Sequence, residues 1–170
     1  MTSSGRRDLR LNSFLPYVLA NLAERVSDGL SHIYADEYQL TIPEWRVIAN
    51  LAEHDTLNAR QIVEFTTMEK SKVSRAVTNL CARGLVSQQR ARGDSRAKDL
   101  ALTVAGEALY REIVPRVLAW EQSLLEGLEV GEYRDLLYLL DKLGKRLQSG
   151  GAGKLEETAK AGAAAADRFS

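Results

Sequence analysis

The chain has 170 residues, of which 45% are hydrophobic, so it has the length and apolar content for one compact domain, with or without an appendage. A single cysteine, Cys81, excludes an internal disulfide framework, and two histidines, His32 and His54, argue against a zinc site, so neither a metal nor a cofactor is expected. No apolar segment suits export or a bilayer span, which predicts a cytoplasmic protein without membrane contact.

Charge is unevenly distributed along the chain, although its 23 basic and 23 acidic residues balance. The stretch from Lys70 to Lys98 holds eight basic residues and one acidic residue, Asp94, which gives it a net charge of +7 and leaves −7 elsewhere. A block of this density is usually a solvated face. Its meaning therefore depends on the structure of the residues between the charges.

The first expected element is a long amphipathic helix. Apolar residues recur at helical spacing from Leu11 to Ile33. Asn12 is a suitable N-cap, and Pro16 then falls in the first turn, where its missing N–H has no intrahelical acceptor. Proline at this place is compatible with a helix.

Three short helices are expected next, over residues 41–53, 58–65 and 67–84. Each has a local start signal, and Gly84 is a suitable residue to end the third. The start signals are Thr41 followed by Ile42-Pro43-Glu44, the capping-box pair Asn58 and Gln61, and the segment Thr67 to Glu69.

A β-hairpin and two further helices complete the prediction. The turn is expected at Gly93-Asp94, and residues 99–103 alternate in polarity as a strand does. Helical spacing returns from Thr103, with a kink expected at Pro115, and Gly131 is expected to separate a last helix. Residues 149–170 contain few large apolar groups and are expected to form a flexible tail.

Helix, turn, helix and then an arginine-rich hairpin is the plan of a winged helix-turn-helix, whose second helix enters the major groove of DNA. Short hydroxyls and long cations near the start of that helix can reach base edges and phosphates, while Val73, Val77 and Leu80 lie on the opposite face. The DNA contacts predicted from the helix are Lys70, Ser71, Lys72, Ser74 and Arg75.

The hairpin, or wing, supplies a second set of predicted DNA contacts. Arginine gains from the negative potential of a narrow minor groove. An acid beside DNA is repelled, so Asp94 is expected to orient the wing by holding Arg96 or a backbone amide. The predicted wing residues are Arg90, Arg92, Asp94, Arg96 and Lys98.

Residues 71–106 resemble the MarR family. The resemblance rests on the Ser-Arg helix, on the pattern L-x-x-R-G-L-V that ends it, on D-x-R at residues 94–96, and on L-T-x-x-G at residues 102–106. With its flanking helices it covers about residues 11–148. It implies a homodimer that binds double-stranded, pseudo-palindromic DNA as a repressor, which a small molecule, often an aromatic acid, releases.

A ligand site is suggested near residues 42–48, where Trp45 could stack on an aromatic acid and Arg46 could pair with its carboxylate. The other candidates are Tyr17, His32, Tyr34 and Tyr38. The alternatives are that Trp45 is a core residue and that Arg46 pairs with an acid on a neighbouring helix. Some members of the family sense peroxide through a cysteine in the first helix, whereas Cys81 lies elsewhere and is better explained as a buried small residue.

The predicted fold is mainly α-helical with a small β-hairpin wing: a winged helix-turn-helix plus a helical dimerisation domain. Its parts are a dimerisation helix (1–40), a DNA-binding lobe (41–103), C-terminal dimerisation helices (104–148) and a tail (149–170). No constellation of nucleophile, base and orienting group indicates an enzyme. Two alternatives stay open: an activator or counter-silencer of the SlyA type without a dedicated ligand, and a helical protein-interaction module.

Overall fold

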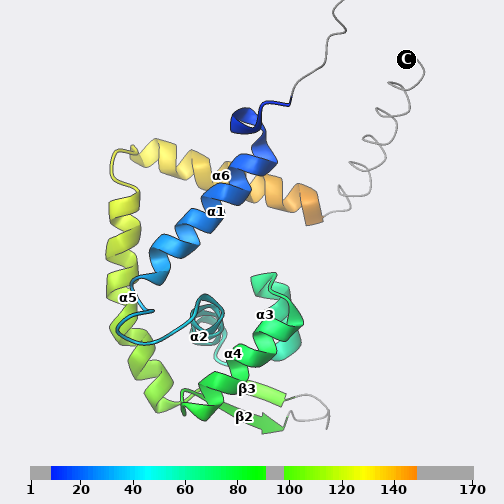
Figure 1. The fold of residues 1–170 in the computed structure, drawn as a ribbon, viewed down its shortest axis with the longest axis vertical. Coiled ribbons are helices and arrows are strands. Elements are labelled where there is room, and N and C mark those ends of the chain that lie inside the picture. The colour runs from blue at the N-terminus through cyan, green and yellow to red at the C-terminus, as the bar shows by residue number, and fades with distance from the viewer. Residues whose placement is uncertain (1–8, 91–97, 149–170) are drawn as a thin grey trace, which may run out of the picture. The chain divides into compact units, whose positions relative to one another are not determined.

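The structure, a computed structural model, describes residues 9–90 and 98–148 (Figure 1). The chain forms two compact units, Met1–Glu121 and Gln122–Ser170. The prediction of a mainly helical chain with a small β-hairpin is confirmed, while the predicted domain boundaries stay predictions. The elements are η1 (Leu11–Ser13), α1 (Leu15–Ser31), α2 (Ile42–His54), β1 (Leu57–Asn58), α3 (Ala59–Thr66), α4 (Lys70–Ala82), β2 (Val86–Arg90), β3 (Lys98–Leu102), α5 (Val104–Leu124) and α6 (Val130–Arg146).

The first long helix begins later than predicted. Residues 11–13 form a 3-10 turn, so Asn12 cannot be the N-cap of α1, and that prediction is wrong. Phe14 takes the N-cap position without a side-chain hydrogen bond. Pro16 lies in the first turn of α1, as predicted, because no intrahelical acceptor is needed there.

Two reciprocal capping boxes start α2 and α3. The Thr41 hydroxyl accepts the Glu44 N–H, and the Glu44 carboxylate accepts the Thr41 N–H at 2.8 Å. Asn58 and Gln61 make the same exchange at 3.0 and 2.9 Å. Both starts were predicted from the sequence, that of α3 from its capping-box pair and that of α2 from a cap at Thr41 followed by a first-turn proline and an acid.

The sheet has three antiparallel strands in the order β1-β3-β2. The predicted hairpin is present, with Val86 opposite Leu102 and Arg90 opposite Lys98. The third strand, β1, which pairs Leu57 with Leu100, was not predicted from the sequence. A strand of two residues is too short to show alternation, so only its pairing partner reveals it.

One apolar core joins residues 34–40, α2, α3, α4, the sheet and α5. Ile48, Ile62 and Leu80 are fully buried in it, and so is Ile113 of α5. α5 is therefore fixed directly to the helix-turn-helix, and it continues through Pro115 as one helix.

The C-terminal helices carry a boundary that was predicted four residues too late. Gly127, with φ +93°, lies in the turn between α5 and α6, whereas Gly131 lies in the first turn of α6. The prediction that Gly131 separates the helices is therefore wrong. Among the described residues, every helix falls short of the length and apolar character that a transmembrane span requires.

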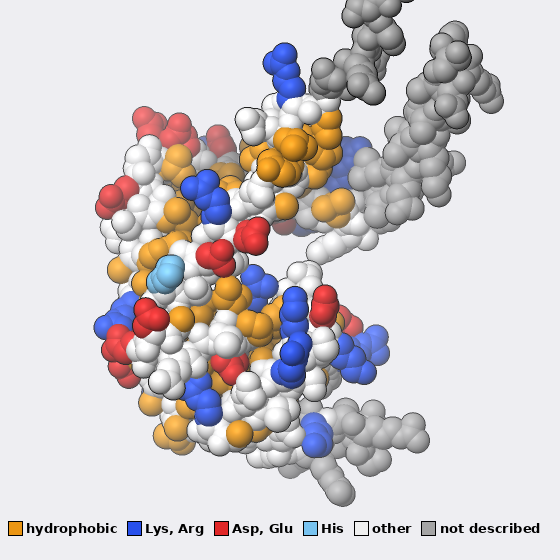
Figure 2. Space-filling model, in the orientation of Figure 1, with side chains coloured by type: hydrophobic (Ala, Val, Ile, Leu, Met, Phe, Trp, Pro, Cys, Tyr) orange, Lys and Arg blue, Asp and Glu red, His pale blue; other side chains and the backbone are white. Residues whose placement is uncertain are grey.

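Large apolar side chains remain exposed on α1, on the end of α5 and on α6, and Figure 2 shows those of α1 as an orange cluster. These helices have more apolar surface than the core of one chain covers. On α1 and just before it they are Leu9, Leu11, Phe14, Leu15, Tyr17, Val18 and Leu22, and on α6 they are Val130, Leu136, Leu137, Tyr138, Leu139, Leu140 and Leu143.

Candidate nucleic-acid interface

The helix α4 has one buried and one exposed face. Val73, Val77 and Leu80 are at most 5% exposed and join the core, as predicted. Burial of this face turns the opposite one towards solvent, and the N-terminal dipole of the helix favours an anion beside its first turn. The five predicted DNA contacts, Lys70, Ser71, Lys72, Ser74 and Arg75, are all exposed.

Residues 67–69 join α3 to α4 in a tight turn. Thr67 adopts a left-handed conformation with φ +54°, and Met68 is buried against the core. The Thr66 hydroxyl donates to the Ile62 carbonyl and accepts the Met68 N–H, which closes the end of α3. The connection holds two short helices in the arrangement of a helix-turn-helix.

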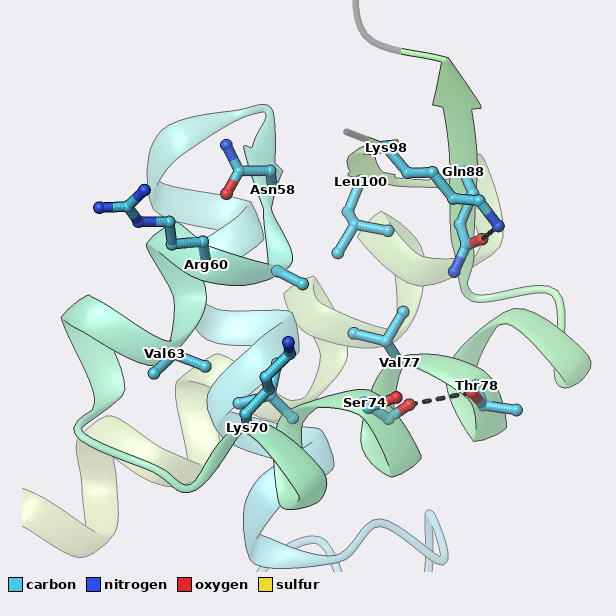
Figure 3. A pocket seen from close by; sticks show the side chains of 12 residues that line it. Asn58, Arg60, Val63, Lys70, Ser74, Val77, Thr78, Gln88, Lys98 and Leu100 are labelled. Atoms are coloured by element: carbon cyan, nitrogen blue, oxygen red, sulfur yellow. Dashed lines mark hydrogen bonds between the residues drawn. The ribbon is translucent and has the colours of Figure 1, made fainter. Parts of the chain in front are cut away.

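A groove of about 790 Å³ lies between α3, α4 and the sheet (Figure 3). Its floor is apolar, with Val77 and Leu100 facing into it, and Lys70, Arg60 and Lys98 lie around its edge. The cations at its edge suit contacts with the phosphates of a nucleic-acid strand. Its lining residues are Asn58, Ala59, Arg60, Val63, Lys70, Val73, Ser74, Val77, Thr78, Gln88, Lys98 and Leu100.

The base of the wing is ordered by a contact between strands. Lys98 Nζ donates to Gln88 Oε1 at 3.1 Å, and both side chains line the groove. Arg90 ends β2 opposite Lys98, but its side chain lies outside the described residues. The predicted contacts Arg92, Asp94 and Arg96 also lie outside them, so the role given to Asp94 stays a prediction.

Four polar residues of the groove were not among the predicted DNA contacts: Asn58, Arg60, Thr78 and Gln88. Arg60 is exposed and pairs with Glu64 at 3.0 Å, an ordinary surface ion pair. Thr78 lies one turn beyond Ser74 and was the one that helical spacing could have found. The others lie beside α4 only because the sheet and α3 are folded against it.

The L-T-x-x-G segment fixes the hairpin to the start of α5. Thr103 Oγ1 accepts the Gly106 N–H at 3.1 Å and donates to the Gly84 carbonyl at 2.7 Å. The Thr103 N–H donates to the Leu85 carbonyl at 3.0 Å. The end of α4, the end of β3 and the start of α5 therefore meet at one point, which sets where the wing leaves the core.

Among the ligand candidates, Trp45 is 8% exposed and belongs to the core. Its ring stacks between Tyr34, at a centroid distance of 5.3 Å, and Tyr110, at 5.9 Å. This matches the alternative that Trp45 is a core residue, and a ligand role for it stays a prediction.

Arg46 lies beside this stack. Its Nη2 donates to Ser27 Oγ of α1 at 3.1 Å, and within the described ranges no carboxylate lies at ion-pair distance from it. Arg46 therefore bonds to the neighbouring helix through a hydroxyl and not through an acid. Burial raises the pKa of the Tyr34 hydroxyl, and the nearby Arg46 charge opposes that rise.

The remaining candidates do not gather around Arg46. Tyr17 lies ten residues before Ser27 on α1, which is about 15 Å along the helix axis. His32 is exposed at the end of α1. Tyr38 is buried and donates its hydroxyl to Glu112 Oε1 of α5 at 3.1 Å. Burial, followed by this hydrogen bond, raises the pKa of Tyr38, so the hydroxyl stays protonated.

Cys81 is half-buried near the end of α4, where it packs against the core. Burial raises the pKa of its thiol, and the smaller effects of Gln88 and Lys98 oppose the rise. A protonated thiol is a weak nucleophile. This environment agrees with the interpretation of Cys81 as a small packing residue.

Comparison with known proteins identifies relatives of the whole arrangement. The model of the MarR family matches residues 38–97, which include α2, α3, α4 and β2. The transcriptional regulator FarR of Neisseria gonorrhoeae is 30% identical over 124 residues, covering 67% of this chain and 80% of FarR.

Solved structures show the same fold. A MarR family regulator from Silicibacter pomeroyi is 27% identical, with a TM-score of 0.70 over 81% of this chain and 94% of that one. BpsR of Bordetella bronchiseptica, whose DNA binding is regulated by 6-hydroxynicotinic acid, is 24% identical, with a TM-score of 0.72 over 81% of this chain and 97% of BpsR. The latter likeness shows the fold alone.

Proposed function

The chain belongs to the MarR family of winged helix-turn-helix transcriptional regulators. From this premise we propose that it is a homodimeric repressor bound to a pseudo-palindromic operator. A small aromatic carboxylate releases the repressor from that DNA. Each protomer places α4 in a major groove, and the wing contacts the adjacent backbone and minor groove. The two recognition helices lie about 34 Å apart, one turn of DNA.

The observation that carries the DNA-binding part is the division of α4 into two faces. Val73, Val77 and Leu80 hold one face in the core, so Lys72 and Arg75 lie together on the solvent side near the helix start. Arginine can bond the O6 and N7 atoms of guanine together, and lysine serves as a phosphate contact. The cationic edge of the groove extends this surface towards the wing.

Replacing Arg75 tests the recognition helix. We expect Arg75→Ala to weaken binding to a duplex that the wild-type protein selects from random-sequence DNA by about 1 to 3 kcal/mol, because base contacts have this value. Fluorescence anisotropy at fixed salt measures the change. The matched control is Arg111→Ala, which removes an exposed arginine of α5 that already pairs with Glu107. Unchanged affinity in the Arg75 variant would contradict the assignment of α4 as the recognition helix.

Homodimer formation is supported by the exposed apolar side chains of α1 and α6. Leu15, Val18 and Leu22 of α1 are all at least 39% exposed, and so are Leu136, Leu140 and other residues of α6. Monomeric proteins rarely leave such surfaces open, and pairing of two copies covers them. We expect sedimentation equilibrium to give a dimer at micromolar concentration; a monomer under these conditions would contradict the proposal.

The ligand part of the proposal concerns Arg46 and the aromatic stack beside it. A guanidinium with no carboxylate partner in the described ranges, next to Tyr34 and Trp45, offers charge and aromatic surface to an aromatic acid. In BpsR such an acid, 6-hydroxynicotinic acid, regulates DNA binding. For this chain, the class of ligand and not that compound is proposed.

Replacing Arg46 tests the ligand site. Benzoate and 6-hydroxynicotinic acid are titrated into the complex with the selected duplex. We expect Arg46→Ala to require at least about ten-fold more acid for release, because a hydrogen bond to a charged group contributes roughly 1.5 to 3 kcal/mol. Arg46→Lys is the control that keeps the charge but loses the planar fork. Equal release of wild type and Arg46→Ala would exclude this residue, and indifference of the wild type to both acids would contradict the ligand part.

An activator or counter-silencer without a dedicated ligand is the second candidate, and indifference to both acids favours it. A helical protein-interaction module is disfavoured, because it has no use for a net charge of +7 concentrated on residues 70–98. Among the residues that the structure describes, no group of three or more acidic, histidine or cysteine side chains could hold a metal ion.

A further inference from the structure

Arg83 follows the last residue of the recognition helix α4. The termination of this helix does not depend on the Arg83 side chain. Gly84, with φ +69°, donates its N–H to the Cys81 carbonyl at 3.0 Å, and Leu85 donates to the Leu80 carbonyl at 3.0 Å. These two bonds form a Schellman motif, which satisfies the last carbonyls through the backbone. The guanidinium of Arg83 therefore has another role.

That guanidinium binds the loop between α1 and α2. Nη2 donates to the Tyr38 carbonyl at 2.8 Å, and Nη1 donates to the Gln39 carbonyl at 3.0 Å. Gln39 has φ +52°, an uncommon conformation for a residue other than glycine, which persists where its surroundings fix it. The two arms of one planar fork hold two successive carbonyls, a geometry that lysine cannot reproduce.

The same loop is held from its other side by α5. Tyr38 donates its hydroxyl to Glu112, and the guanidinium of Arg116 lies 5.7 Å from the centre of the Tyr38 ring. Arg116 also pairs with Glu37. Residues 37–39 are thus a bridge: the carbonyls of Tyr38 and Gln39 are bound to Arg83 at the end of α4, and the side chains of Glu37 and Tyr38 are bound to α5.

We propose that Arg83 is a positioning residue for DNA recognition, which sets the direction of α4 by fixing its C-terminal end to residues 38 and 39 and, through them, to α5. The inference rests on the proposed function, since it concerns how the recognition helix is held. It assigns Arg83 no DNA contact. A shift at the end of the helix moves Ser74 and Arg75 relative to the bases without removing either side chain.

Salt dependence distinguishes positioning from direct binding to phosphate. Removing one phosphate-binding side chain from each protomer lowers the slope of log affinity against log salt concentration by about 2 per dimer, since each neutralised phosphate contributes about 0.9. A positioning residue changes the affinity and leaves the slope as it was. Arg83→Lys is informative because lysine keeps the charge for phosphate but cannot bind both carbonyls.

The experiment measures binding of the full-length dimer to the selected duplex, with Arg83→Lys, Arg83→Ala and the control Arg111→Ala at several salt concentrations. We expect both Arg83 variants to bind between about 2-fold and 30-fold more weakly, with an unchanged salt slope, because substitutions along coupling networks have this range of effect. Wild-type affinity in Arg83→Lys, or a lower slope in Arg83→Ala, would overturn the proposal.

A measurement without DNA separates this inference from the proposed function. The Leu40 N–H donates to the Tyr34 carbonyl at 3.1 Å, so its hydrogen exchange reports on the loop. We expect faster exchange of Leu40 in Arg83→Lys while the global stability changes little; unchanged exchange would overturn the proposed bridge. Weaker binding in Arg83→Lys with no effect of Arg75→Ala would instead contradict the recognition-helix assignment.

Discussion

Affinity for the selected DNA duplex is expected to fall by about 10³-fold to 10⁵-fold between about 50 and 200 mM monovalent salt, the range for a protein with six to ten phosphate contacts. The stretch 70–98 carries eight basic residues per protomer. Lys70, Lys72 and Arg75 are exposed on α4, and Lys98 lies at the groove, which makes at least about six contacts per dimer available. Anisotropy titrations at four or five salt concentrations give the slope.

Lys72→Ala provides the matched test of where that slope originates. If Lys72 contacts phosphate in both protomers, the slope falls by about 2 per dimer, and affinity falls for every sequence alike. Arg111→Ala, on the exposed surface of α5, is the control that removes one positive charge from a helix without a predicted DNA contact. For the wild-type protein, a change in DNA affinity of less than about ten-fold between about 50 and 200 mM salt would contradict binding through the phosphate backbone.

The sequence predicted elements whose causes are local. The starts of α2 and α3 depend on pairs three residues apart, and the end of α4 depends on Gly84, so each signal lies inside the segment that it controls. β1 escaped prediction because its two residues become a strand only by pairing with Leu100, more than forty positions later. The prediction of Asn12 as the N-cap of the first helix was wrong because residues 11–13 form their own 3-10 turn before α1 begins.

The candidate DNA-binding site also combines local features, which could be predicted from the sequence, with long-range contacts, which could not. The exposed face of α4 could be predicted, since burial of Val73, Val77 and Leu80 follows from helical spacing within one element. The bridge from Arg83 to residues 38 and 39 could not, because backbone carbonyls carry no sequence signal. The burial of Trp45 depends in part on Tyr110, 65 positions away, so local reasoning left a ligand role and a core role open together.

Gly106→Ala is expected to be the most destabilising small substitution among the described glycines. A Cβ atom at Gly106 would lie 2.1 Å from the Leu85 carbonyl oxygen and 3.1 Å from its carbon. Both atoms belong to the backbone, so no side chain can move aside. The Leu85 oxygen also accepts the Thr103 N–H, which fixes it further. We expect a decrease of about 3 kcal/mol in the free energy of unfolding, the upper end of the usual range for overpacking.

Denaturant unfolding at one fixed protomer concentration measures this decrease, because the stability of a dimer depends on concentration. The control is Gly131→Ala, where an added Cβ meets no atom within 4 Å and the expected change is below about 0.5 kcal/mol.

Gly106 lies where α4, β3 and α5 meet, so a chain that relieves the clash must move α5 relative to the wing. We therefore expect weaker DNA binding in any Gly106→Ala protein that remains folded. Wild-type stability in this variant would show that Leu85 and α5 can separate freely, which contradicts the rigid connection on which the placement of the wing depends.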